Sequence, residues 1–409
     1  MSERAPLLAV DEALSRIAAA LPPTEACTIS LDSALGAVLA APVAALLDHP
    51  PAAVSAMDGY AARAADLSSF PARLEMIGES AAGHPYQGEI AAGQCIRIFT
   101  GATCPASADT IILQEDTSQD DTTITINEAP APGRFIRPRG QDFAAGLKLF
   151  DEGVMINARN LSLIGAAGHG EVTVRRRPVV AILSTGDELV EPGTPPAEGQ
   201  IISSNGVFLQ HLVKALGGEP MPLGIIADRD DALDAALTRA MDADLIITSG
   251  GASVGAHDGI ARKMQDASDL SFWRIAMRPG KPLLFGHLEE NGRKTPLLGL
   301  PGNPVSTGVC GLIFGAAAIR SLLGQDHRPS YTHAVLTASL NENDQRQDFL
   351  RARLEYGTDG RMMATAFSKQ DSGMLSVFAE ANGLIMRPPH AAAANAGDVV
   401  PVICIPDQI

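Results

Sequence analysis

The chain has 409 residues, too many for one hydrophobic core, and this length predicts roughly two to four domains. Hydrophobic residues make up 46% of the chain and charged residues 19%, which excludes an intrinsically disordered protein. The formal net charge of −16 argues against nucleic acid and anionic membranes as partners, because proteins that bind them carry a basic surface. A small anionic ligand stays compatible with this charge, since only the charge close to the ligand decides its binding.

Cysteine content and apolar segments bear on the compartment. The five cysteines include no C-x-x-C pair, so we expect no disulfide framework and no structural zinc site, and a reducing, cytoplasmic compartment. Residues 1–20 lack the basic and long apolar regions of a signal peptide. The apolar run Val305–Ile319 is shorter than the ~20 residues that a membrane span needs, so it predicts a buried helix and no membrane association.

Two helices are predicted near the N-terminus. Apolar residues between positions 7 and 21 recur with a period close to 3.6 residues, and Pro22 and Pro23 end this helix. Residues 30–39 predict a second, short helix that begins near Asp32 or Ser33. A third helix is predicted over Asn157–Ala167.

Two stretches have a strand-and-turn pattern. From about residue 45 to residue 145, short alternating segments such as Cys95–Phe99 and Thr122–Ile126 are separated by Gly, Pro and Asp, which predicts a small β-rich domain. After Pro329 the pattern returns and predicts a C-terminal β domain or barrel. Its predicted strands are residues 332–340, 348–355, 362–366, 383–386 and 398–405.

The segment from residue 178 to about 324 alternates between buried strands and helices. This order predicts a mostly parallel sheet with right-handed crossovers, and the fold class is therefore a multidomain combination of α/β and β parts. The predicted strands are 179–183, 222–226, 244–248, 283–285 and 297–300, and the helices are 205–216, 230–241, 259–267 and one from Pro304. The predicted domains are an extended helical linker domain (1–45 and 141–177), a β-rich inserted domain (46–140), an α/β domain (178–327) and a C-terminal β domain (328–409).

Three loops follow strands of the predicted parallel sheet. They are Ser184–Glu188, Ser249–Gly255 and Pro301–Pro304, and ligands of such sheets bind beyond the carboxyl ends of the strands. Their small residues expose backbone N–H groups, and the third loop opens a helix whose N-terminus attracts anions. The candidate oxyanion-binding residues in these loops are Ser184, Thr185, Gly186, Ser249, Gly250, Gly251, Ser253, Gly255, Pro301, Gly302 and Asn303.

Cations and acids accompany these loops. Arg274, Arg278 and Lys281 lie in or just before a Pro-Gly-Lys-Pro turn and suit a phosphate-like oxyanion, a reading that their neighbours favour over the alternative of a strand with solvated charges. Acids among phosphate-binding loops indicate a divalent ion, commonly Mg²⁺. The candidate metal ligands are Asp187, Glu188, Asp228 and Asp258.

Two common catalytic motifs do not occur in the sequence. It contains no H-E-x-x-H and no Walker A pattern, so P-loop ATP hydrolysis is a poor reading. Residues 251–255 have the G-x-S-x-G spacing, but they lie in the loop predicted to bind an anion, and we do not favour serine-based hydrolysis. The residues by themselves predict a metal-assisted enzyme that acts on a phosphorylated or nucleotide-linked small molecule.

Seven motifs occur in an order that resembles the bacterial MoeA family, the molybdopterin molybdenumtransferases, which are related to the E domain of gephyrin. The resemblance runs from about residue 7 to the C-terminus. The motifs are Ser55–Ala61, Thr100–Gly101, Gly140–Asp142, Ser184–Leu189, Ser249–Gly255, Pro279–Pro282 and Leu300–Pro304.

The resemblance implies a function and a four-part, elongated protomer that forms a homodimer. The central domain would be of the molybdopterin-binding type, and the reaction would insert molybdate into adenylylated molybdopterin, with Mg²⁺ present and AMP released. The molybdopterin adenylyltransferase and molybdoenzyme chaperones would be candidate protein partners. The positions that match the family's site are Asp58 and Thr100 (expected to reach the pocket across the dimer), Glu188, Asp228 and Asp258 (metal ion and adenylyl linkage), Lys281 (oxyanion) and Ser372.

The sequence departs from the family pattern at two places. Arg274 and Arg278 stand where relatives often carry lysine, and Arg presents a planar fork in place of a point charge. Asp371 adds a negative charge beside Ser372, where a small residue is commoner. Separately, Arg137 and Arg139 are candidates for steering an anionic substrate toward an otherwise acidic protein, and surface solvation explains them equally well.

Two other functions remain open from the sequence. One is the molybdopterin adenylyltransferase, whose fold the α/β segment also resembles, and the other is a non-catalytic scaffold of the gephyrin kind. The long β-rich insert and the C-terminal domain favour molybdenum insertion over the adenylyltransferase, which is a smaller protein. The sequence does not distinguish molybdate from tungstate.

Overall fold

The computed structural model describes residues 7–251, 259–266, 270–290 and 292–407. The chain forms two compact units. One consists of Thr28–Leu35 and Ala41–Thr173, and the other of Met1–Cys27, Gly36–Ala40 and Val174–Ile409. The chain passes between them within β1 (Ala26–Ser30) and β12 (Glu171–Arg175), and also at either end of the segment Gly36–Ala40. The finer division into four domains stays a prediction.

The first unit contains the β-rich segment that the sequence predicts. Its main sheet has the order β7-β4-β6-β5-β9-β8, and alternate residues such as Ile96, Ile98 and Ile124 are fully buried. The bounds are β4 Gly59–Ala62, β5 Ala72–Ser80, β6 Gln94–Ile98, β7 Thr110–Leu113, β8 Thr117–Asp120 and β9 Thr123–Ile126, with 3₁₀ turns at Ala64–Asp66 and Gln114–Asp116.

Short elements complete this unit. Strand β2 (Val43–Ala44) pairs with β11 (Lys148–Phe150), and β3 (Val54–Ser55) pairs with β10 (Ile136–Arg137). Helix α2 (Ala158–Ala166) is confirmed, and it begins at a capping box in which the side chains of Asn157 and Asn160 each accept from the other residue's backbone N–H.

The prediction of a helix over residues 30–39 is wrong. Only a single 3₁₀ turn, Leu31–Ser33, forms there. Gly36 follows with a φ of +74°, which lies outside the right-handed helical region, and Leu39 makes a β-bridge with Val174. The apolar residues of this segment therefore lie in a turn and in extended chain, and not on one face of a helix.

The central sheet of the second unit has the order β16-β13-β17-β21-β20-β18. Strands β16, β13, β17 and β21 are parallel, as predicted. Strand β20 is antiparallel to both of its neighbours: it forms a hairpin with β21 that pairs Glu290 with Arg293, and it pairs on its other side with β18, which runs in the direction of β21. The bounds are β13 Val179–Thr185, β16 Glu219–Ile226, β17 Leu245–Ser249, β18 Leu270–Trp273, β20 Leu284–Glu290 and β21 Arg293–Leu300. A small parallel pair, β14 (Leu189–Val190) and β15 (Ile201–Ile202), follows β13.

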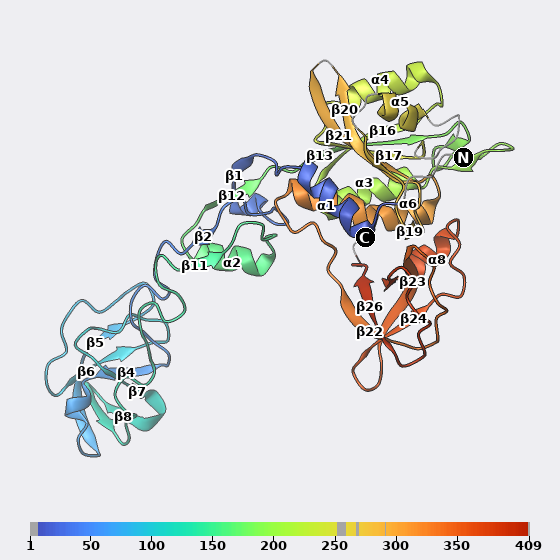
Figure 1. Ribbon diagram of the computed structural model, residues 1–409. Helices are drawn as coiled ribbons and strands as arrows, with labels where there is room; N and C mark the ends of the chain where they lie inside the picture. The colour runs from blue at the N-terminus through green and yellow to red at the C-terminus, as the bar shows by residue number, and fades with distance from the viewer. Residues whose placement is uncertain (1–6, 252–258, 267–269, 291, 408–409) are drawn as a thin grey trace. The chain divides into compact units, whose positions relative to one another are not determined.

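Helices cover both faces of this sheet (Figure 1). Val180 and Ile182 of β13 pack in one core cluster with α1, α3, α6 and α7, whereas Ala181 and Leu183 pack in another with α4 and α5. A strand that is buried on both faces reads as an unbroken apolar run, which is how the sequence predicted β13. The bounds are α1 Val10–Ala20, α3 Asn205–Ala215, α4 Asp230–Ala240, α5 Gly259–Asp266, α6 Pro304–Cys310 and α7 Ala316–Leu322.

The most apolar helix belongs to this core. Helix α6, a π-helical stretch over Gly311–Gly315 and α7 run on from one another. Among the described residues, Pro304–Leu322 is the one helix long and apolar enough to cross a membrane, but 89% of its apolar window is buried inside the protein. It is the core helix that the sequence predicts.

The C-terminal β barrel is confirmed, and it takes one strand from the α/β segment. The sheet order is β19-β23-β24-β22-β26-β25, and pairing between β23 and β25 closes the barrel. Strand β19 (Met277–Arg278) comes from the α/β segment and pairs in parallel with β23. The other bounds are β22 Thr332–Leu336, β23 Gln347–Tyr356, β24 Met362–Ala366, β25 Gly383–Arg387 and β26 Val399–Cys404, and helix α8 (Leu375–Glu380) was not predicted.

Candidate functional site

A cavity of about 510 Å³ lies at the carboxyl ends of β13, β17 and β21. Register pairs Ser184 with Ser249 and Ser249 with Leu300, so the loops after these strands begin side by side. The predicted site residues that line the cavity are Thr185, Gly186, Glu188, Asp228, Ser249, Gly250, Gly251, Pro301, Gly302 and Asn303. The structure thus brings together the described parts of all three predicted loops. Ser184 is itself buried and lies outside this lining.

Close backbone packing explains the paired glycines of the second loop. Gly250 has a φ of +88°, and a Cβ on it would lie 2.7 Å from the carbonyl oxygen of Thr185. Gly251 has a φ of +65°, and its Cβ would lie 3.0 Å from the Ile260 side chain. Side chains at either position would push the second loop away from the first. Ser253, Gly255 and Asp258, which the sequence assigns to this site, lie outside the described residues.

Asn205, the first residue of α3, joins the second and third loops. Its Nδ2 donates to Ser249 Oγ at 2.7 Å and to the carbonyl oxygen of Gly302 at 2.7 Å. The sequence placed Asn205 only at the start of the predicted helix 205–216, so its role in the site was missed. The available signal was the run Ser203-Ser204-Asn205 at the start of a helix, which also lines the cavity.

Replacing Asn205 with Ala should loosen the two loops that it joins. Both hydrogen bonds are donated by Nδ2, so their loss should lower the free energy of unfolding by about 1–2 kcal/mol and raise KM for the substrate. Asn205→Asp should be at least as harmful, since the carboxylate cannot donate to Gly302. Gln210→Ala on the same helix is the control, and an Asn205→Ala protein with unchanged KM and melting temperature would contradict the assignment.

An apolar wall of the cavity was also missed. Ile201 and Ile202 of β15 are 56% and 40% exposed and line the cavity beside Leu189. Large apolar side chains that remain exposed at a cavity suit a flat, partly apolar ligand. Their sequence context, after a stretch rich in Gly and Pro and just before α3, gave no periodic signal that could have identified them.

Of the described acids that the sequence predicts as metal ligands, two line the cavity and one holds the backbone behind it. Glu188 and Asp228 line the cavity, whereas Asp187 is exposed and its Oδ1 accepts the backbone N–H of Asp228 at 3.0 Å. Two carboxylates facing an anion-binding loop fit Mg²⁺, which is commonly held by one or two carboxylates, water and substrate phosphates. Within the described ranges, no group of three or more His, Cys, Asp or Glu side chains is placed to hold a metal ion on its own.

A second cavity of about 320 Å³ adjoins the first. Thr185 and Asp228 line both of them. The second cavity continues toward the start of α4, where Asp230 and Leu233 lie, and toward Ile260 of α5. The site therefore has two lobes with a shared middle.

The segment with the predicted cations borders the first cavity through Pro282. Lys281 is exposed one residue before it. The Arg274 guanidinium lies 5.2 Å from the Trp273 ring, and its residue has a φ of +81°. The Arg278 guanidinium pairs with Asp348 and Asp344 of the C-terminal barrel, and its assignment to the oxyanion stays a prediction.

Ser372 reaches the third loop from the C-terminal part of the chain, as the resemblance implies. Asn303 Nδ2 donates to Ser372 Oγ at 3.0 Å, and the backbone N–H of Val305 donates to the Ser372 carbonyl oxygen at 3.1 Å. The neighbouring Asp371 accepts the backbone N–H of Gly373 at 2.7 Å, which satisfies part of its charge locally.

Arg351 is a charged residue behind this contact that the sequence did not single out. Its side chain is only 2% exposed, and its Nη2 donates to the Asp371 carbonyl oxygen at 3.4 Å. Burial lowers the pKa of Arg351 to about 10, and the nearby Asp371 and Asp348 oppose this shift. Nothing in the spacing of β23 distinguishes Arg351 from a solvated arginine.

Asp58 and Thr100 lie in the first unit and contact each other. The backbone N–H of Thr100 donates to Asp58 Oδ1 at 2.7 Å, and its hydroxyl donates to the same oxygen at 2.8 Å. These two hydrogen bonds hold the pKa of Asp58 below its usual value. Asp58 and Thr100, which are 42 positions apart in the sequence, are thus joined by two hydrogen bonds that favour the ionised carboxylate.

The candidate steering arginines differ in their surroundings. Arg139 pairs with Asp48, whose pKa is lowered first by the backbone N–H of Ala145 and then by Arg139 itself. Arg137 is exposed in β10. The steering hypothesis therefore depends mainly on Arg137, since the charge of Arg139 is largely neutralised.

Replacing both Arg137 and Arg139 with Ala should weaken substrate affinity at low salt and have no effect at high salt. Long-range steering is screened once the Debye length falls to about 3 Å, near 1 M salt. KM measured at low and high ionic strength tests this expectation. Unchanged affinity at low salt would end the steering hypothesis.

Comparison with known proteins covers almost the whole chain. Residues 8–168 match the MoeA N-terminal region (domain I and II), residues 181–321 the "Probable molybdopterin binding domain", and residues 333–405 the MoeA C-terminal region (domain IV). The molybdopterin molybdenumtransferase of Haemophilus influenzae is 35% identical over 97% of this chain and 98% of that protein. The molybdopterin molybdenumtransferase of a Nostoc species is 34% identical over 92% of this chain and 88% of that protein.

A solved structure shares the fold along its full length. The molybdopterin biosynthesis moeA protein of Pyrococcus horikoshii OT3 has a TM-score of 0.83 and 26% identity, and the match covers 98% of this chain and 100% of that one. The similarity thus includes the β-rich and C-terminal segments as well as the α/β segment.

Proposed function

The chain belongs to the MoeA family of molybdopterin molybdenumtransferases, and from that premise we propose that it inserts molybdate into adenylylated molybdopterin and releases AMP, with Mg²⁺ present. The observation that carries the proposal is the two-lobed site, in which Thr185 and Asp228 line both cavities. The substrate has two parts joined by a pyrophosphate, so it fits two lobes with a polar middle.

The parts of the substrate are assigned by the chemistry of each lobe. The larger lobe is lined by Gly250 and Gly251 of the second loop and has an apolar wall at Ile201 and Ile202, which suits the pterin half and molybdate. The smaller lobe, toward α4 and α5, takes the adenylyl half. The pyrophosphate then lies at Thr185 and Asp228, between the halves.

AMP release is the cleavage of a phosphoanhydride. Water adds to one phosphorus, the bond from that phosphorus to the bridging oxygen breaks, and the products are AMP and the pterin monophosphate. Glu188 and Asp228 would hold a Mg²⁺ ion that offsets the charge of the phosphate oxygens. Thr185 and Ser249 orient the substrate oxygens, and Lys281 attracts the molybdate dianion.

The remaining assignments follow from family membership. Asp58, Thr100, Asp258 and Ser372 take part in the reaction together with Glu188 and Asp228. The protein works in the cytoplasm as a homodimer with a four-part protomer, and its candidate protein partners are the molybdopterin adenylyltransferase and molybdoenzyme chaperones. These assignments are proposals that site-directed variants and the mass of the native protein can test.

The two other functions are less well supported. The adenylyltransferase alternative needs only the α/β segment, whereas the relatives match the β-rich and C-terminal segments too. The scaffold alternative does not account for two carboxylates that face a cavity of this size. Neither explains why Ser372 hydrogen-bonds to Asn303 at the third loop.

The test is to incubate the protein with adenylylated molybdopterin, molybdate and Mg²⁺ and to measure AMP. We expect AMP release that requires molybdate. Release without molybdate, or no release, would contradict the proposal. Formation of pyrophosphate and adenylylated pterin from ATP and molybdopterin would identify the adenylyltransferase instead.

A further inference from the structure

We propose that Asp348 is a positioning residue of this site, which acts through Arg278 to hold the Lys281 turn at the rim of the cavity. In this arrangement the C-terminal barrel sets the place of the oxyanion-binding cation. The role of Lys281 itself rests on the proposed function, whereas the mechanical link does not.

The link begins with a two-point ion pair. Arg278 Nε donates to Asp348 Oδ1 at 2.7 Å, and Nη2 donates to Asp348 Oδ2. The Asp348 side chain is only 7% exposed, and the pairing raises the pKa of Arg278. Paired Arg–carboxylate forks of this kind fix direction as well as distance, because both planes must align.

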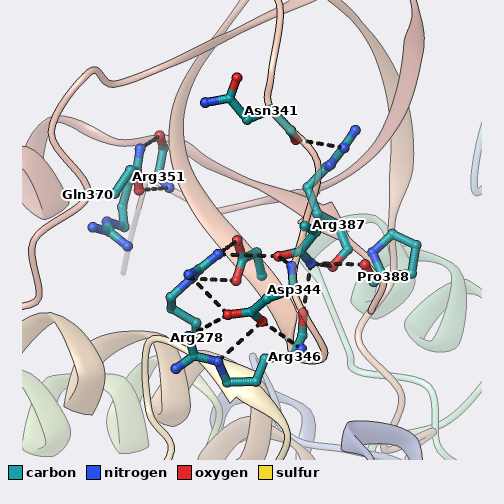
Figure 2. A network of polar contacts seen from close by, with 10 residues as sticks. Arg278, Asn341, Asp344, Arg346, Arg351, Gln370, Arg387 and Pro388 are labelled. Carbon is teal, nitrogen blue, oxygen red and sulfur yellow. Dashed lines mark hydrogen bonds and ion pairs between the residues drawn. The ribbon is translucent and has the colours of Figure 1, made fainter. Parts of the chain in front are cut away.

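Neighbouring groups hold the same guanidinium (Figure 2). Asp344 Oδ2 lies 3.5 Å from Arg278 Nη1, and Asn343 Oδ1 accepts from Nη2 at 3.2 Å. Asn343 in turn donates from Nδ2 to the carbonyl oxygens of Arg346, Arg387 and Pro388. The acceptors around Arg278 are therefore themselves fixed by the backbone of the barrel.

Backbone pairing places Arg278 on the barrel. Met277 and Arg278 form β19, which runs parallel to β23 with Arg278 opposite Asp348. The backbone N–H of Gln347 donates to the Ala276 carbonyl oxygen at 2.8 Å. On the other side of β23, the backbone of Asp348 lies opposite that of Arg387 in the antiparallel strand β25, which closes the barrel.

The Lys281 turn follows β19 directly and is held at its far side. Gly280 has a φ of +110°, and a Cβ on it would lie 2.3 Å from Cys310 Sγ in α6. The Lys281 carbonyl oxygen accepts the backbone N–H of Ile275 at 3.1 Å, and Pro282 lines the cavity. A short turn that is packed at both ends transmits a shift at Arg278 to Lys281.

This arrangement predicts that lysine cannot replace arginine at position 278 of this chain without loss. Lysine has one point of charge and cannot make the two-point contact with Asp348. If Arg278 instead bound the oxyanion directly, lysine would serve nearly as well, and Asp348 would weaken binding by competing for the charge. The two roles therefore predict opposite outcomes.

The experiment compares Asp348→Asn, Arg278→Lys and the double variant. For each single variant we expect faster amide hydrogen exchange over residues 274–283 and a KM for molybdate raised about tenfold, because small misplacements of a binding group are costly. KM for adenylylated molybdopterin should stay within about twofold, and the double variant should resemble the singles, since both break one contact. Asp359→Asn is the matched control, because Asp359 pairs with Arg361 within the barrel.

Any of the following results would overturn the inference. Unchanged exchange in Asp348→Asn removes the mechanical link, whatever the activity. Faster exchange with an unchanged KM for molybdate, with or without a lower melting temperature, makes the pair merely structural. A normal Arg278→Lys protein would make Arg278 an oxyanion ligand or a solvated charge. Absence of molybdate-dependent AMP release by the unmodified protein would contradict the proposed function, and the exchange data would still decide the link.

Discussion

Replacing Glu188 with Gln should lower the rate of molybdate-dependent AMP release by about 100-fold or more while leaving the fold intact. Glu188 is exposed at the cavity wall, beside Asp228 and the glycine-rich loop. Gln keeps the size and the polarity but removes the negative charge that a divalent ion would need. Because the side chain is solvated, its replacement should leave the melting temperature within a few degrees of the unmodified protein.

Glu198→Gln is the matched control for this prediction. Glu198 is exposed in the turn between β14 and β15, so its loss changes the net charge equally without touching the cavity. Raising the Mg²⁺ concentration should partly restore the Glu188→Gln protein if the lost charge is a metal ligand. A large fall in melting temperature with little change in rate would reassign Glu188 to stability.

The core of the α/β segment could be predicted from local pattern. The apolar run Val179–Leu183 is a strand buried on both faces, and its neighbours follow the same rule. Once the strands are parallel, their carboxyl ends must meet at one edge, and this places the three loops together. The positions of Gly250 and Asn303 in the cavity wall could be inferred for that reason.

Contacts between distant segments could not be predicted in this way. Arg278 and Asp348 are 70 residues apart, and nothing near either residue shows that β19 joins the C-terminal barrel. The antiparallel direction of β20 was missed for a similar reason, because a short apolar run does not reveal its direction, and β18 was not predicted as a strand at all. Arg278 therefore looked like an oxyanion ligand in sequence and is an ion-pair partner in the structure.

The double role of Asn205 illustrates the same limit. The start of α3 was predictable from the Ser-Ser-Asn run there, although Ser204 at the N-cap position makes no side-chain cap hydrogen bond. The bonds of Asn205 to Ser249 and Gly302 depend on how α3 packs against β17 and β21, which is set by the whole sheet. Local chemistry gave the residue's conformation, and only the tertiary structure gave its partners.

Gly250→Ala should remove most of the activity and destabilise the protein. The Cβ would lie 2.7 Å from the carbonyl oxygen of Thr185, a distance that real Cβ atoms do not show, and that oxygen is backbone and cannot turn away. The second loop must move, which opens the hydrogen-bonded wall of Ser249 and Gly302 that Asn205 holds. We expect a loss of about 2–3 kcal/mol in the free energy of unfolding, from backbone strain and lost packing together.

Gly199→Ala is the control that separates the clash with Thr185 from the strain of the left-handed backbone. Gly199 has a φ of +83°, close to the +88° of Gly250, but nothing lies within 4 Å of the position that a Cβ on Gly199 would take. This control should lose only about 1 kcal/mol and keep its activity. Chemical denaturation and AMP release, measured on both variants, decide the case. Equal losses in the two proteins would mean that the left-handed backbone alone is responsible, and that the approach of the second loop to Thr185 does not shape the site.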